Sequence, residues 1–286
     1  MRRNHLRSLL AAGKPSLGTH LLSTWPTLVE LVGQTGFFDY VEFSAEYAPF
    51  DLHDLDNLGR ALELKNLGGM IKIEQGQTTH QAMRGIGSGF QSVLFCDVRT
   101  VADAEKCVAS VRAETPGSGG RHGVGLRRDV GTLQEIGTPA FVEALDNIVV
   151  ALMIEKRECV ENLQAVLSVK GIDMVQFGPA DYAMSIGVPG QFDHPEVRKA
   201  ERKTIEAALE LGLHPRVEIG DIRKAELYLE MGVKHFCIGW DVFILHEWWS
   251  ANGRGMRTLL NGGSRDADDH ASPPASTGAG VAGYTN

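Results

Sequence analysis

"NIVVALMIEKRECVENLQAVLSVKGIDMVQFGPAD", residues 147–181, contains two apolar runs separated by a stretch of mixed polarity. Residues 147–155 are rich in aliphatic and β-branched side chains and end at an acid, Glu155. Residues 173–178 form the second run, and another acid, Asp181, follows it closely. Short apolar runs that alternate with helix-like stretches are typical of βα units in a parallel sheet. We therefore expect this segment to be one such unit.

The same pattern repeats along most of the chain. The candidate strands are residues 16–22, 38–44, 68–74, 91–96, 147–155, 173–178, 214–219 and 234–239. Most strand ends lie about 20–30 residues apart, which is the length of one strand, one helix and two short loops. A Rossmann sheet would also need a GxGxxG motif after its first strand, and the sequence has none there. The pattern predicts an α/β fold of the TIM (β/α)8 barrel type, as a single domain over residues 1–261.

Composition and charge exclude several other classes of protein. The formal net charge is −8 and the basic residues are scattered, which argues against a nucleic-acid surface. The four cysteines form no CxxC pair, the N-terminal stretch lacks the apolar segment of a signal peptide, and no apolar run is long enough for a membrane span. We expect a soluble cytoplasmic protein without a membrane partner. Residues 262–286 are small, polar and rich in Gly and Pro, so we expect a disordered tail.

Glu155 and Asp181 are the first candidates for a functional site. In a TIM barrel, the active site lies at the carboxyl ends of the strands, and these two acids follow adjacent strands. Two carboxylates that leave room for water and substrate suit Mg²⁺ or Mn²⁺. The alternative is that the two acids only end strands and cap helices.

Longer motifs resemble a known family. These are "ALMIEKRECVENLQAVLSVKGIDMVQFGPADYAMSIGVPGQFDHPEV" (151–197), "FFDYVEFSAEYAP" (37–49) and "MGVKHFCIGWD" (231–241). They are similar to the HpcH/HpaI aldolase family, with the GPAD segment the most specific feature. The resemblance implies a TIM barrel with an extended or exchanged C-terminal helix, and a homo-oligomer that is a trimer or hexamer. It also implies cleavage of 4-hydroxy-2-oxo acids to pyruvate and an aldehyde.

By the same resemblance, Glu155 and Asp181 are the ligands of Mg²⁺, Mn²⁺ or another divalent metal ion. The metal would bind a 2-oxo acid through its carbonyl and carboxylate oxygens and stabilise a pyruvate-type enolate. Backbone groups around Gly178, Pro179 and Ala180 would hold the substrate carboxylate, although Pro179 has no N–H to donate.

The sequence departs from the family pattern at four places in the expected pocket. In "SAEYAP", Ser44 replaces an acid and Tyr47 replaces the histidine of the usual base. Lys72 stands where the family has an arginine, His20 where it has a tryptophan, and Met153 where it has a glutamine. Lysine keeps the charge of arginine but loses its bidentate fork. These departures make ordinary aldolase chemistry an open question.

The replacements are themselves candidate catalytic groups. His20 and Tyr47 are the best substitutes for the missing acid–base pair, and Lys72 is a third catalytic candidate. Because side chains alternate along strands, Glu42 and Glu74 are expected to join Lys72 in a charged network near His20. The alternative is a purely structural ion-pair network.

Two further residues are predicted to bind substrate. Ser44 lines the same expected pocket. Arg121 is a candidate for a distal carboxylate, either within the chain or across a subunit interface.

The leading functional hypothesis is a divalent-metal-dependent carbon–carbon lyase that acts on a small 2-oxo acid. One alternative is a decarboxylase or condensing enzyme on the same metal–enolate platform, which needs no aldol base. Another is a Schiff-base aldolase that uses Lys72. A third is a catalytically inactive barrel that serves as a binding or assembly subunit.

Overall fold

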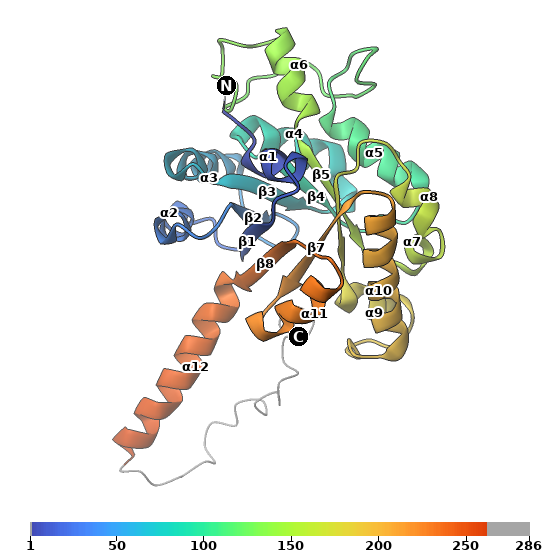
Figure 1. Cartoon of the computed structure of the whole chain (residues 1–286). Helices are drawn as coiled ribbons and strands as arrows, with labels where there is room; N and C mark the ends of the chain where they lie inside the picture. Colours follow the sequence, from blue (N-terminus) through green and yellow to red (C-terminus); the bar gives the residue numbers. More distant parts are fainter. Residues whose placement is uncertain (1, 262–286) are drawn as a thin grey trace.

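Eight parallel strands close into a barrel in chain order (Figure 1). The computed structural model describes residues 2–261, so the predicted disorder of residues 262–286 lies outside the described residues. The strands are β1 (Ser16–Leu21), β2 (Tyr40–Ser44), β3 (Gly68–Ile73), β4 (Ser92–Phe95), β5 (Val149–Ile154), β6 (Met174–Phe177), β7 (His214–Ile219) and β8 (His235–Trp240). The prediction of a TIM barrel is confirmed, and each strand lies within two residues of its expected bounds.

Helices surround the barrel and fill the connections between strands (Figure 1). The α-helices are α1 (His5–Ala11), α2 (Pro26–Thr35), α3 (Leu52–Lys65), α4 (Thr78–Ser88), α5 (Val101–Val111), α6 (Pro139–Asp146), α7 (Arg157–Glu161), α8 (Leu163–Leu167), α9 (Pro179–Ser185), α10 (Pro195–Glu210), α11 (Ala225–Glu230) and α12 (Asp241–Leu260). Two short 3₁₀ turns, η1 (Gln75–Gln77) and η2 (Ile222–Lys224), follow β3 and β7. The two long intervals between strands hold α6 and α9 as extra helices, which leaves the regular βα repeat intact.

Helix α1, which the strand pattern did not predict, covers the amino-terminal end of the barrel. Asn4 donates hydrogen bonds from its side-chain amide to the backbone oxygens of Gln91 (2.7 Å) and Asn147 (2.8 Å). Leu6 and Leu10 are buried and belong to the apolar cluster inside the barrel. The chain therefore closes the end of the barrel that is opposite the expected site.

Alternation along the strands separates an outer core from the barrel interior. Val41 and Phe43 of β2 point outward and pack in the large core between strands and helices. Tyr40 points inward into an apolar layer at the amino-terminal end. Glu42 and Ser44 are also inward-facing and buried, nearer the carboxyl end. The interior thus changes from apolar to charged along the barrel axis, and the polar layer lies at the end where TIM-barrel sites form.

His235, at the start of β8, is a buried histidine that pairs in strand register with Arg216 of β7. Its Nδ1 lies 2.9 Å from Ser16 Oγ, and its ring meets His214 edge-on at 5.1 Å. Burial, with a contribution from the nearby cations, lowers the pKa of His235 to about 4. A histidine that stays neutral in the folded state is protonated at higher pH in the unfolded chain.

This difference predicts that stability falls on acidification. Between the unfolded pKa of about 6.5 and the folded pKa, the unfolded state binds more protons, so the free energy of unfolding decreases as the pH decreases. His235 contributes up to about 2 kcal/mol to that loss near pH 5. Urea denaturation of His235→Gln at neutral and acidic pH measures it: the pH slope should become smaller, whereas exposed His53→Gln should leave it unchanged. Equal slopes for His235→Gln and the wild type would contradict the assignment.

Helix α12 continues from β8 away from the barrel (Figure 1). Its start is fixed by Asp241, whose carboxylate accepts hydrogen bonds from the backbone N–H groups of Leu22 (3.0 Å) and Ser23 (2.9 Å). An extended C-terminal helix was expected, and the structure has one. Across residues 2–261, none of the helices combines the length and the apolar character that a membrane span requires.

Candidate active site

Glu155 and Asp181 lie at the carboxyl ends of neighbouring strands. Glu155 follows β5 directly, Asp181 lies in the first turn of α9 after β6, and the two strands pair in parallel. The Glu155 side chain is almost fully buried, and its Oε1 accepts a hydrogen bond from the backbone N–H of Asp97 (2.7 Å). Burial raises the pKa of Glu155 to about 7, the charge of Lys72 opposes this shift, and Asp181 adds to it. The charges of Lys72 and Asp181 therefore act on Glu155 in opposite directions.

The backbone of Gly178 leaves room for the Glu155 carboxylate. A Cβ atom at position 178 would lie 2.7 Å from Glu155 Oε2 and 2.8 Å from Glu155 Cβ. The absence of a side chain lets the start of α9 approach the end of β5. The carboxylates of Glu155 and Asp181, which follow these two neighbouring strands, are hard oxygen donors of the kind that fit a divalent ion such as Mg²⁺ or Mn²⁺.

Lys156, the residue after Glu155, reaches across to the acids of the two neighbouring strand ends. Its Nζ lies 2.6 Å from Asp97 Oδ1 and 2.8 Å from Asp181 Oδ1. Burial alone would lower the pKa of Lys156, but its hydrogen bonds to Asp181 and Asp97 outweigh burial and raise it. An ammonium group thus already neutralises one of the two predicted metal ligands.

Lys72 lies on β3 inside the same end of the barrel. Its Nζ forms an ion pair with Glu46 Oε2 at 2.8 Å and lies 4.8 Å from the centre of the Tyr47 ring. Cys96 donates its thiol to the same Glu46 oxygen (3.3 Å). Tyr47 is 44% exposed, so it is the part of this cluster that solvent reaches most easily. Lys72 and Tyr47, predicted as separate replacements, are therefore direct neighbours.

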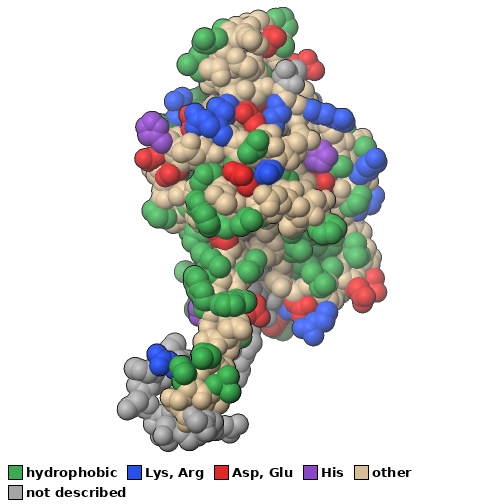
Figure 2. All heavy atoms as spheres, turned by 90° about the vertical axis from the view of Figure 1, so that its left-hand side faces the viewer, with side chains coloured by type: hydrophobic (Ala, Val, Ile, Leu, Met, Phe, Trp, Pro, Cys, Tyr) green, Lys and Arg blue, Asp and Glu red, His purple; other side chains and the backbone are tan. Residues whose placement is uncertain are grey.

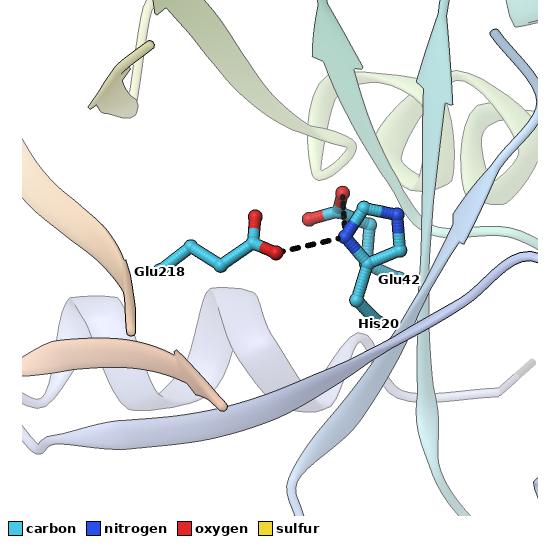
Figure 3. A group of neighbouring side chains, drawn as sticks. All are labelled: His20, Glu42 and Glu218. Atoms are coloured by element: carbon cyan, nitrogen blue, oxygen red, sulfur yellow. Dashed lines mark hydrogen bonds and ion pairs between the residues drawn. The ribbon is translucent and has the colours of Figure 1, made fainter. Parts of the chain in front are cut away.

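His20 lies deeper and has carboxylates on one side (Figure 3). Its Nδ1 is 3.1 Å from Glu218 Oε1 and 3.5 Å from Glu42 Oε1. The Trp240 ring stacks on the imidazole at a centroid distance of 4.1 Å, and no surface of His20 is exposed. In this arrangement His20 cannot contact a substrate, which argues against the predicted acid–base role and for a positioning role.

The expected charged network exists, but with different members. Arg216, which lies on β7, donates to Glu42 and to Gln176, and its Nε donates to Tyr40 Oη (2.7 Å). Lys72 pairs with Glu46 instead, and the backbone N–H of Glu74 donates to Gln81 beyond the end of β3.

His20, Glu42 and Glu218 also have the spacing of a metal site. One ligand atom from each lies within 4.8 Å of the others, and they are the one such group of three among residues 2–261. The neighbours of this group are cationic, since Arg216 neutralises Glu42. Burial raises the pKa of Glu218, but the charge of His20, with a further contribution from Arg216, outweighs it and lowers the pKa. The cluster is therefore better described as a buried ion network than as a second metal centre.

The predicted substrate-binding residues differ in whether their polar groups already have hydrogen-bond partners within the chain. Ser44 is buried at the end of β2, and within residues 2–261 no hydrogen bond reaches its Oγ. Gly178 donates its N–H to Ile154 O (3.1 Å), so it is not available to a substrate carboxylate, which corrects that expectation. Pro179 has no N–H, so the first turn of α9 leaves Ala180 and Asp181 as donors.

Arg121 does not reach the site within its own chain. Its N–H bonds to Ala109 O near the end of α5, and its side chain is exposed. Helix α5 starts beside the site and runs for 11 residues, about 16 Å, toward the amino-terminal end of the barrel. Figure 1 shows the segment between α5 and α6 at the end opposite α9 and α12. A role for Arg121 would need a neighbouring subunit.

Comparisons with known proteins agree with this geometry. The family described as "HpcH/HpaI aldolase/citrate lyase" matches residues 17–247. A 4-hydroxy-2-oxo-heptane-1,7-dioate aldolase of Shigella flexneri is 28% identical over 242 residues, which cover 85% of this chain and 89% of that protein. A 5-keto-4-deoxy-D-glucarate aldolase of Klebsiella pneumoniae is 27% identical over 244 residues, covering 85% of this chain and 93% of that protein.

A solved structure is similar over nearly the whole barrel. The HpcH/HpaI aldolase from Desulfitobacterium hafniense DCB-2 has a TM-score of 0.80 and 25% identity, and the match covers 90% of this chain and 97% of that one. The family match extends over well more than half of the chain, from β1 into α12. The chain belongs to the HpcH/HpaI aldolase/citrate lyase family, and the two relatives above are named as aldolases, which are carbon–carbon lyases.

Proposed function

We propose that this protein is a divalent-metal-dependent lyase that acts on a small 2-oxo acid through a pyruvate-type enolate. The observation that carries the proposal is the position of Glu155 and Asp181 at the carboxyl ends of two paired strands, with Lys72 inward-facing at the same end of the barrel. A bound Mg²⁺ or Mn²⁺ would supply the Lewis acidity that stabilises negative charge on the 2-oxo oxygen. The side chains that would hold it are those of Glu155 and Asp181.

Other residues of the chain would supply positive charge, bind the substrate carboxylate and exchange a proton. Lys72 adds positive charge beside the reacting carbonyl, in the place where the family has an arginine. The N–H groups of Ala180 and Asp181 point out of the first turn of α9 and suit the substrate carboxylate. Tyr47 is the exposed group next to Lys72, so it is best placed to exchange a proton with solvent or substrate.

Decarboxylation or condensation on the same platform is the second candidate. Tyr47, and no histidine, stands in the "SAEYAP" segment, and such a reaction does not require the aldol base. A Schiff base on Lys72 is disfavoured, because an ion pair with Glu46 at 2.8 Å favours the ammonium form, which has no lone pair for attack on a carbonyl.

A homo-oligomer is part of the same proposal, with α12 as a contact surface. Large apolar side chains on this helix are exposed (Figure 2): Ile244, Leu245, Trp248, Trp249, Met256, Leu259 and Leu260. Exposed apolar side chains on a helix that projects from the barrel are typical of subunit contacts. A second copy of the chain, in a trimer or hexamer, would cover it. Sedimentation of the intact protein as a monomer would contradict this part.

Exchange of the C3 protons of pyruvate tests the enolate directly. In D₂O with Mg²⁺, the protein should accelerate loss of the methyl proton signal by at least about 100-fold, because a positioned acid–base group contributes at least that factor. EDTA should abolish the acceleration and added Mg²⁺ restore it. Exchange no faster than in protein-free buffer would favour the binding-subunit alternative. Mass spectrometry after borohydride treatment with pyruvate should show no adduct on Lys72.

A further inference from the structure

Lys156 and the acids around it form a closed cluster at the predicted metal site. Asp97 has a left-handed backbone conformation, with φ of 59°. This turn directs its N–H to Glu155 Oε1 (2.7 Å), while its carboxylate holds Lys156 Nζ (2.6 Å). Lys156 Nζ also contacts Asp181 Oδ1 (2.8 Å), so one ammonium ties together the ends of β4, β5 and β6.

The charges in this cluster explain why a cation is needed there. Asp97 and Asp181 both contact the Lys156 ammonium, which supplies a positive charge from inside the chain, and Glu155 accepts the backbone N–H of Asp97. The Lys156 side chain is only 12% exposed, so its interactions are less screened than those of a surface pair. A divalent ion that uses Asp181 binds a carboxylate that the ammonium already neutralises through Oδ1 (2.8 Å), so it meets the repulsion of that ammonium if Lys156 stays in place.

We propose that Lys156 is a built-in counter-ion that competes with the divalent metal for Asp181. In the metal-free protein it keeps Asp181 and Asp97 together, and metal binding moves it off Asp181 while Asp97 retains it. This inference rests on the metal site of the proposed function. It goes beyond it, because it assigns to Lys156 control over metal affinity and over the stability of the metal-free state.

Two readouts that do not depend on catalysis test the competition. Titration of Mn²⁺, followed by the electron paramagnetic resonance signal of the free ion, should show that Lys156→Met binds Mn²⁺ at least about tenfold more tightly than the wild type, because loss of a nearby charge is worth that factor. Lys156→Arg keeps the charge and should stay near the wild-type affinity. The metal-free Lys156→Met protein should melt at a lower temperature, and its stabilisation by Mn²⁺ should be larger.

Lys199→Met is the matched control. Lys199 forms an exposed ion pair with Glu196 at 3.8 Å, so its removal should change neither Mn²⁺ affinity nor the melting temperature. Mn²⁺ affinity of Lys156→Met equal to or weaker than that of the wild type would overturn the inference, as would absence of Mn²⁺ binding in both. If Lys156→Met binds more tightly while pyruvate exchange is absent, the inference stands and the proposed function fails.

Discussion

Glu155→Gln should abolish metal-dependent chemistry while leaving the barrel folded. The substitution keeps the size of the side chain, and the amide oxygen can still accept the hydrogen bond from the Asp97 N–H (2.7 Å in the wild type). It removes the negative oxygen that a divalent ion requires. We expect the affinity for Mn²⁺ to fall at least about 100-fold, since even residues that only support a ligand change affinity by 10–100-fold. The rate of metal-dependent pyruvate exchange should fall by about 1000-fold or more.

Asp181→Asn should cause the same loss of Mn²⁺ affinity and of pyruvate exchange, but through the second predicted ligand. It removes the second predicted ligand and leaves Lys156 with Asp97 as its ion-pair partner, so the positive charge remains at the site without the carboxylate that attracts the metal. Calorimetric titration with Mn²⁺ measures both variants. Glu158→Gln is the control, because Glu158 is an exposed acid three residues after Glu155 and should bind Mn²⁺ like the wild type. Unchanged Mn²⁺ binding in both site variants would refute the metal assignment.

The sequence was sufficient for the barrel and for the position of these two acids. Strand-length apolar runs recur at the spacing of βα units, and that local pattern fixes both the strand bounds and the face on which Glu155 and Asp181 emerge. Helix α1 was missed, because its short apolar stretch gives too little periodicity to be distinguished from a loop. Its burial depends on the barrel end that it covers.

The partners of the site residues could not be predicted from local pattern. Asp97 and Glu46 each lie two residues after the end of a strand, β4 and β2 respectively, and the rule that charges at strand ends are candidates would have included both. Arg216 and Glu218 lie two residues apart on β7, so both face the barrel interior. The residues that they contact on other strands depend on the stagger of all eight strands, which a local sequence pattern does not reveal. His20 shows most clearly that residue type alone does not predict a role. Its residue type suggested catalysis, whereas its burial under Trp240 points to a positioning role.

Arg216→Met should cause the largest loss of stability. Arg216 is fully buried, forms an ion pair with the fully buried Glu42, and hydrogen-bonds Gln176 and Tyr40. Methionine fills a similar volume but leaves the Glu42 carboxylate in the barrel without its guanidinium partner. Breaking a buried pair by removing one member costs about 3–5 kcal/mol, which is a large fraction of the stability of an ordinary domain. Urea denaturation followed by circular dichroism measures the change.

Two further variants show whether the loss of stability in Arg216→Met comes from the unpaired Glu42 charge or from the changed packing. In Arg216→Met/Glu42→Gln no unpaired charge remains, so the double variant should recover part of the loss, because the penalty lies in the uncompensated carboxylate and not in the absence of the pair. Arg223→Met removes an exposed arginine that pairs with Asp221, and it should leave the free energy of unfolding close to that of the wild type. If Arg216→Met were as mild as Arg223→Met, the buried network would not stabilise the barrel, and the polar layer beneath the site would have to be kept for the chemistry alone.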